Sequence, residues 1–345
     1  MMSQRIIGGM FGLPDAIGER STAPPFIYEH SILLVNARSG LSLLTEFILP
    51  PKIWLPSYLC HTIVDGVLNA GGKIEFYALD SDLRPLSYDW LQKVGAGDLI
   101  VWIDYFGWPC DDSFFDMLRK SGAFILEDAC QAMLSEGIGK HSDFVLVSPR
   151  KFLGVPDGAV LTAQNNRFDL SKASLMDPPG EWWLQAFMAM VLRREFDVHG
   201  EPNRWYELYK SMDAAHPIGR YAMSQLSHIL LMRGFDYDSI AERRIANYEI
   251  LASQLGEFAL FPERPPGVVP LGFPIRTEYR DQLRQALFKE YIYPPIHWLI
   301  QDVVPAQFNE SHKLAQEIMT LPCDQRYAQR DMERIAKLVR RELKL

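Results

Sequence analysis

Short apolar segments that alternate with amphipathic segments are the feature that most constrains how this chain can fold. The run Leu99–Tyr105 is almost entirely apolar, which is typical of a strand buried on both faces of a sheet. Similar short runs lie at Ala123–Leu126, Phe144–Val147 and Ala159–Thr162, and helical patterns lie between several of them. This alternation predicts an α/β fold with a mostly parallel, mixed sheet flanked by helices.

The later part of the chain has a different texture. Tyr237–Leu255 has the pattern of a long helix, and Gln329–Leu343 that of a charged terminal helix. A chain of 345 residues is also too long for one ordinary core. We therefore expect a large lobe over residues 1–235, with an irregular N-terminal segment, and a smaller C-terminal α/β lobe over residues 236–345.

Charge and cysteine content exclude several classes of function. The net charge of −8 argues against a general nucleic-acid-binding protein, which needs clustered lysine and arginine. No stretch approaches the length needed to span a bilayer, and the N-terminus lacks a signal-peptide core. Four scattered cysteines match neither a zinc site nor a disulfide framework: Cys60, Cys110, Cys130 and Cys323. We expect a cytoplasmic protein without a metal.

Two charged residues follow predicted strands, and their combination is chemically informative. Asp128 comes after the strand Ala123–Leu126, and Ser148-Pro149-Arg150-Lys151 follows the next strand. Ligands of such sheets bind beyond the carboxyl ends of the strands. A lysine that forms an imine with the cofactor aldehyde and an aspartate that keeps the pyridine nitrogen protonated are what pyridoxal phosphate (PLP) requires. Ser148 is placed to donate its hydroxyl to the phosphate.

Each of these residues alone also has a purely structural interpretation. An aspartate after a strand is often only the N-cap of a helix, and a lysine beside Arg150 can be a solvated surface pair. The pair, and not either residue, therefore favours a PLP site. No G-x-S-x-G elbow and no G-x-G-x-x-G turn after a strand is present, so serine hydrolase and dinucleotide-binding folds are not indicated.

The chain resembles the DegT/StrS family of PLP-dependent sugar aminotransferases, of the aspartate-aminotransferase-like fold type I. Glu127–Ala132 is similar to the family's E-D-A-A-Q/H-A segment, and Lys151 with Asp157–Val160 is similar to its Schiff-base lysine and E-G-G-A/M-V stretch. The resemblance covers roughly residues 30–345 and is strongest from 36 to 160. It implies that Lys151 carries PLP, that Asp128 meets the pyridine nitrogen, and that Gln131 lies near the ring hydroxyl.

Two more segments carry the resemblance. Ser39–Leu44 is similar to the S-G-T-A-A-L element at the start of a helix, which predicts a helix from Ser39 whose N-terminus binds the phosphate. This implies four phosphate-binding residues: Ser39, Gly40, Leu41 through its backbone N–H, and Ser42. Pro56–His61 is similar to the P-S-Y-T segment that carries a residue stacked on the ring, and Tyr58 or His61 is the candidate.

Departures from the family pattern indicate a divergent branch. Leu146 stands where the family has a phosphate-binding serine, so Ser148 is the expected substitute. Arg220 stands where the family has an asparagine that acts across the dimer, and Arg38 and Arg220 are candidates for binding anions. His297-Trp298 follows a proline-rich turn and either lines the substrate entrance or only packs.

The resemblance implies an aminotransferase that takes an amino group from an amino acid, most often glutamate. The implied acceptor is a nucleotide-linked keto sugar, as in polysaccharide biosynthesis. Lys151, once displaced by the donor, acts as the base, and a homodimer shares its active sites. Two alternatives remain open: another PLP reaction such as a sugar dehydratase or a lyase, and a non-catalytic regulatory protein of the same fold.

Overall fold

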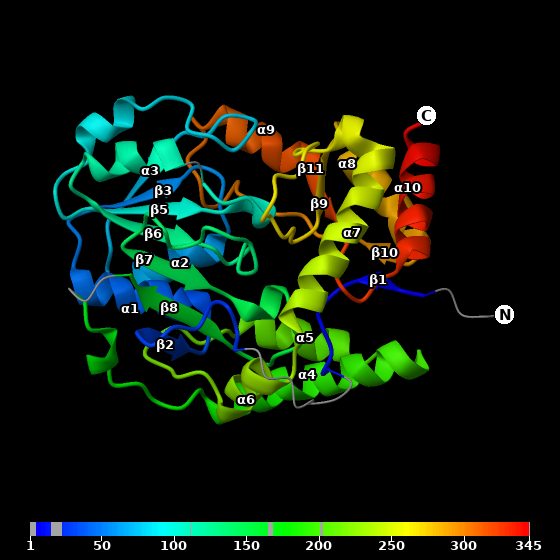
Figure 1. Ribbon diagram of the computed structural model, residues 1–345, viewed down its shortest axis with the longest axis horizontal. Helices are drawn as coiled ribbons and strands as arrows, with labels where there is room; N and C mark the ends of the chain where they lie inside the picture. Colours follow the sequence, from blue (N-terminus) through cyan, green and yellow to red (C-terminus); the bar gives the residue numbers. More distant parts are fainter. Residues whose placement is uncertain (1–4, 15–22, 111, 165–167, 201–202, 345) are drawn as a thin grey trace.

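The computed structural model describes residues 5–14, 23–110, 112–164, 168–200 and 203–344. Its centre is a seven-stranded sheet in the order β2-β8-β7-β6-β5-β3-β4 (Figure 1). The strands are β2 (Ser31–Leu34), β3 (Ile53–Pro56), β4 (Ile74–Tyr77), β5 (Leu99–Ile103), β6 (Phe124–Asp128), β7 (Phe144–Val147) and β8 (Ala159–Ala163). Strand β8 runs antiparallel to both of its neighbours, β2 and β7, and the other neighbouring pairs are parallel. The predicted α/β fold with a mostly parallel sheet is confirmed.

Helices cover the sheet, and a second lobe lies beside it (Figure 1). The helices before residue 236 are α1 (Ala37–Ile48), α2 (His61–Asn69), α3 (Asp112–Arg119), α4 (Gly180–His199), α5 (Trp205–Ala214) and α6 (Gln225–Arg233). The strands of the sheet are buried because apolar side chains cover both faces: all five residues of β5 and of β8 are buried. This burial explains why the sequence reads as continuous apolar runs.

The second lobe is built around a separate small sheet. Strand β9 (Phe273–Arg276) pairs antiparallel with β11 (Ile318–Leu321). The helices of this part are α7 (Tyr237–Leu255), α8 (Arg280–Lys289), α9 (Asn309–Glu317) and α10 (Gln329–Glu342). Helix α7 has the bounds that the sequence pattern predicts. Among the described residues, no helix is both long enough and apolar enough to cross a membrane.

The N-terminal segment departs from the prediction that it is an irregular part of the large lobe. Strand β1 (Ile7–Gly8) pairs in parallel with β10 (Ile292–Tyr293), and Ile7 is fully buried in the hydrophobic core of the second lobe. A strand of two residues is too short to produce a period in the sequence. The pairing depends on a partner almost three hundred residues away, so no local pattern could have indicated it.

Candidate active site

The carboxyl ends of three neighbouring parallel strands bring the candidate residues together. Asp128 is the last residue of β6, where it lies opposite Ile103 of β5 and Leu146 of β7. Lys151 ends a short 3-10 helix, Pro149–Lys151, that directly follows β7. Both charges act on the thiol of Cys130, whose pKa is raised mainly by burial and further by Asp128, while Lys151 lowers it. The two predicted catalytic residues therefore lie in one region at the edge of the sheet.

Asp128 is a buried carboxylate whose charge is not balanced inside the protein. Its side chain is 6% exposed, and Oδ1 accepts a hydrogen bond of 3.0 Å from the backbone N–H of Cys130. It forms no ion pair within the described part of the chain. A buried charge of this kind is costly unless a cation or several donors face it. The site therefore fits a ligand that presents a protonated nitrogen to Asp128.

Lys151 lies beneath residues of the second lobe. Its Nζ is 5.8 Å from the centre of the Trp298 ring, and it makes no hydrogen bond or ion pair among the described residues. Burial, and then the Lys151 charge, lowers the pKa of His297 to about 3. His297 is therefore neutral at physiological pH. Trp298 packs against Tyr58 and Tyr105, and a role of His297-Trp298 in lining the substrate entrance stays a prediction.

Gln131 and Ser148 offer donors that the protein itself leaves unused. Gln131 Oε1 accepts a 2.8 Å hydrogen bond from the N–H of Phe106, while its buried Nε2 makes no hydrogen bond within the described residues. Ser148 precedes the 3-10 helix, and its hydroxyl does not cap it. An unpaired buried donor costs about 1–3 kcal/mol, so such a group fits a ligand oxygen better than an empty space. These groups fit the ring oxygen and phosphate of PLP.

The predicted helix start at Ser39 is wrong. Helix α1 begins at Ala37, because Asn36 is its N-cap and accepts a 2.9 Å hydrogen bond from the N–H of Ser39. The free N–H groups of the first turn therefore belong to Ala37 and Arg38. The N–H of Leu41 lies in the second turn, where such groups bond within the helix, and its contact with a phosphate stays a prediction.

The other three predicted phosphate contacts are used for packing or internal hydrogen bonds. Gly40 faces the sheet, where an added Cβ would lie 2.8 Å from Leu146 Cδ1. Ser42 Oγ accepts a hydrogen bond from the side chain of Asn69. Ser39 Oγ contacts the backbone of Pro217 and Gly219. The N–H groups that α1 leaves free at its start are those of Ala37 and Arg38, and the phosphate contacts of Ser39, Gly40 and Ser42 stay predictions.

Positive charge gathers at this helix start. Arg38 is half-buried, and burial lowers the pKa of its guanidinium; Asp213 and Asp65 raise it, and nearby Arg150 lowers it. Arg150 Nη1 lies 2.8 Å from His216 Nε2, and burial together with Arg150 lowers the pKa of His216 to about 4. Two arginines thus stand near the start of α1, which suits a phosphate. Arg220, in contrast, pairs with Glu46 at 2.9 Å on the surface.

The two candidates for ring stacking occupy different environments. Tyr58 is fully buried in an aromatic cluster, with its ring 5.7 Å from that of Trp298 and 6.1 Å from that of Tyr105. The side chain of His61 is 60% exposed and lies 3.9 Å from Asp65. Stacking by either residue stays a prediction.

Cys60, one of the four scattered cysteines, lies near enough to Lys151 for the ammonium charge to lower the pKa of its thiol. It is half-buried at the N-terminus of α2, next to His61. Burial raises its pKa, but hydrogen bonds from His61 and Thr62 and the charge of Lys151 outweigh burial, so the net shift is downward. A cysteine at a helix start followed by histidine was the available signal.

Two buried acids, Asp104 and Glu127, lie close together at the ends of β5 and β6. Asp104 follows β5, and its Oδ1 accepts hydrogen bonds from Trp102 Nε1 and from the N–H of Cys110. Glu127 Oε2 accepts from Ser142 Oγ and Gly139 N. The pKa of Asp104 lies well above its usual range, because the group is fully buried and stands beside Glu127. Asp104 therefore holds its proton to a higher pH than an exposed aspartate does.

This protonation predicts how stability depends on pH. Above about pH 4 the unfolded chain releases the Asp104 proton while the folded chain keeps it, so folding stability falls as pH rises towards the raised folded pKa. Asp104→Asn removes this contribution and should flatten the fall by up to about 1.4 kcal/mol per pH unit. Chemical unfolding at several pH values between 5 and 8, at fixed protein concentration, measures it. An unchanged slope would show that Asp104 is ionised in the fold.

Comparisons with known proteins agree with the site. Residues 95–340 match the model of the DegT/DnrJ/EryC1/StrS aminotransferase family. The fold is similar to that of the aminotransferase TlmJ from Streptoalloteichus hindustanus, at 20% identity and a TM-score of 0.66, over 91% of this chain and 86% of that one. A DegT DnrJ EryC1 StrS aminotransferase from Brucella abortus is similar at 17% identity and a TM-score of 0.64, over 91% and 86% of the chains.

A third structure covers more of both chains. Spr1654 from Streptococcus pneumoniae, solved in its PLP form, is similar at 15% identity and a TM-score of 0.65, over 97% of each chain. At these identities the structures show the fold, and the match to the family model shows the kinship. No curated protein sequence matches this chain.

Proposed function

Because the chain belongs to the DegT/DnrJ/EryC1/StrS aminotransferase family and is a PLP-dependent aminotransferase, we propose that it moves an amino group from glutamate to a nucleotide-linked keto sugar. The observation that supports this proposal is the pair of unbalanced charges, Asp128 and Lys151, at adjacent strand ends. Neither charge has an ion-pair partner among the described residues. A cofactor with a basic ring nitrogen and an aldehyde satisfies both.

The residues of this chain divide the binding of PLP among them. Lys151 provides the amine for covalent attachment, and Asp128 provides the carboxylate for the ring nitrogen. Gln131 Nε2 serves the ring oxygen. Ser148, Arg38 and the first N–H groups of α1 serve the phosphate, with Arg150 adding charge. When bound, PLP supplies the electron sink that stabilises negative charge at the carbon next to the amine.

Lys151 has a second role once the donor amine displaces it. Its free Nζ accepts the proton from the α-carbon of the amino acid and later returns one, as a general base and then an acid. Asp128 holds a negative charge against the ring nitrogen in a site that is poor in water, where the interaction is strong. Trp298, which packs on Tyr58, covers Lys151 with apolar surface and so limits the access of water.

The setting of the reaction is also part of the proposal. We infer a homodimer in which each subunit completes the other's site. Large apolar side chains on the surface of α4 and α6 support it: Leu184, Met188, Ile229 and Met232 are each more than a third exposed. The four cysteines form no disulfide, which supports a cytoplasmic location.

An absorbance spectrum with PLP, repeated after addition of glutamate, tests the proposal. We expect a band near ~420 nm from the lysine-attached cofactor and its conversion towards ~330 nm with glutamate. A band that persists with glutamate, but is converted by another amino acid, would show a different donor. A band that no amino acid converts would favour a dehydratase or a lyase, and the absence of any band would favour a non-catalytic protein.

A further inference from the structure

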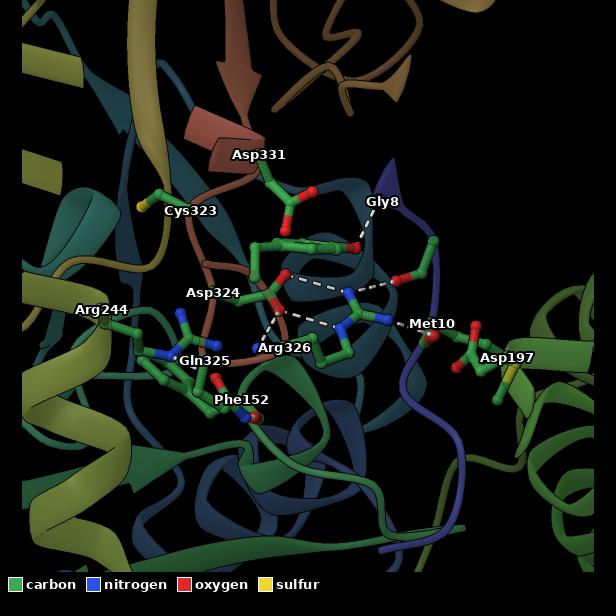
Figure 2. Close-up of polar contacts among 12 residues, drawn as sticks. Gly8, Met10, Phe152, Asp197, Arg244, Cys323, Asp324, Gln325, Arg326 and Asp331 are labelled. Atoms are coloured by element: carbon green, nitrogen blue, oxygen red, sulfur yellow. Dashed lines mark hydrogen bonds and ion pairs between the residues drawn. The ribbon is translucent and has the colours of Figure 1, made fainter. Parts of the chain in front are cut away.

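The residue after Lys151 is held by the second lobe. The carbonyl of Phe152 accepts a 2.6 Å hydrogen bond from Gln325 Nε2, and the Phe152 ring lies under the guanidinium of Arg244, 4.3 Å from its carbon (Figure 2). Phe152 itself is fully buried. Its backbone N–H closes the turn on Pro149 at 2.9 Å. The position of Lys151 is therefore fixed on one side by contacts that do not belong to the sheet.

The burial of the Arg244 charge lowers the stability of the fold more than a structural contact alone would require. It is completely buried on α7, and its donors bind only neutral oxygens: Gln325 Oε1 at 2.8 Å and the carbonyls of Pro270 and Leu271. Asp324, the nearby acid, is paired with Arg326 at 2.8 Å (Figure 2). A buried charge without an ion pair costs stability. The guanidinium nitrogens of Arg244 connect Gln325 to the backbone of the second lobe, and the flat face of the guanidinium lies on the Phe152 ring.

The N-terminal segment holds the same loop from another side. Gly154 lies so close to this segment that an added Cβ would be 1.9 Å from the carbonyl oxygen of Gly12. Arg326 binds the carbonyls of Gly9 and Met10 and lies over the Phe11 ring at 4.1 Å. We call residues 148–154 the Lys151 loop. It is enclosed by the second lobe and by the N-terminal segment that pairs with that lobe.

We propose that Gln325 and Arg244 are positioning residues that set the place of Lys151 by holding Phe152, so that the second lobe controls the reactive amine. The proposal rests on the role of Lys151 given above. Covalent catalysis tolerates errors of only a fraction of an ångström in the reacting groups. A shift of the second lobe is transmitted to Lys151 through one hydrogen bond and one ring contact, without passing through the sheet.

Two substitutions at Gln325 separate positioning from general stability. Gln325→Glu keeps an oxygen for Arg244, adds an ion pair, and replaces the donor to the Phe152 carbonyl with a carboxylate oxygen that repels it. Gln325→Met removes both contacts. If the pair positions Lys151, both variants attach PLP about 10- to 100-fold more slowly than the wild type and shift the pH midpoint of the ~420 nm band. Only Gln325→Met should also lower the Tm clearly.

Ser135→Ala is the matched control. Ser135 Oγ accepts a 2.9 Å hydrogen bond from the N–H of Val269, so the variant removes another buried contact between the lobes, away from the Lys151 loop. We expect a lower Tm with an unchanged attachment rate and band midpoint. A Gln325→Glu variant that attaches PLP at the wild-type rate with the wild-type midpoint would overturn the inference. Failure of the proposed role of Lys151 is distinct, because the wild type would then lack a lysine-attached band.

Discussion

Lys151→Ala should abolish covalent attachment of PLP and lower the rate of the glutamate half-reaction by about ten-thousand-fold. The substitution removes the amine that holds the cofactor and the group that carries the proton of the donor α-carbon. No other lysine ammonium lies over Trp298 among the described residues, so no neighbour can replace it. Borohydride reduction followed by mass spectrometry of the peptide measures attachment, and single-turnover spectroscopy measures the rate.

Two variants make the result specific to Lys151. Lys172→Ala changes a lysine whose side chain is 77% exposed and paired with Asp169, and it should leave attachment and rate unchanged. Lys151→Arg keeps the positive charge beside Cys60 and His297 but cannot attach to an aldehyde, so it should behave like the alanine variant. A reducible attachment that survives in Lys151→Ala would mean that another amine carries the cofactor.

The sequence predicted the parts of the site that one sheet edge determines. The strands β5, β6 and β7 are buried on both faces, so their apolar runs are visible in the sequence, and the residues that end them follow directly. Asp128 and Lys151 were proposed in this way, whereas Gln131 was proposed only from the family resemblance. Helix α1 was placed two residues late, although Asn36, three residues before Ser39, is an N-cap signal that was available.

The parts supplied by packing between the lobes could not be predicted from the sequence. Gln325 lies far along the chain from Lys151, on a segment without regular structure. The sequence named His297-Trp298 as a pair that lines the entrance or packs, but it could not place Trp298 over the Lys151 ammonium. Arg244 is equally hidden, because an arginine in the middle of a helix usually faces solvent. In this protein it is buried, and only the structure shows that it lies on Phe152.

The acid pair below the site shows how environment divides the roles of similar residues. Asp104 and Asp128 follow neighbouring strands and both are buried. Asp104 stands beside Glu127, and burial raises its pKa well above the usual range. Asp128 accepts a hydrogen bond from the N–H of Cys130 but has no ion-pair partner among the described residues. This difference makes Asp104→Asn a matched control for the second major prediction.

Asp128→Asn should retain bound PLP but lower the aminotransfer rate by about a thousandfold. The amide has the same shape, and its oxygen still accepts the N–H of Cys130 that now binds Oδ1 at 3.0 Å, so the strand end keeps its structure. What is lost is the negative charge that keeps the ring nitrogen protonated. Lys151-attached cofactor, titrated by its absorbance, gives the affinity, and single-turnover spectroscopy with glutamate gives the rate.

The control variant decides whether the charge of Asp128 is the cause. Asp104→Asn replaces a buried aspartate whose pKa is raised well above its usual range, so it removes less negative charge than Asp128→Asn does, and its rate should stay within about threefold of the wild type. If Asp128→Asn also stays within tenfold of the wild type, the cofactor ring does not depend on this carboxylate. If both variants lose the rate equally, disruption of the strand ends is the cause. A large loss in Asp128→Asn alone assigns the effect to the one charge at the end of β6 that the protein leaves unpaired.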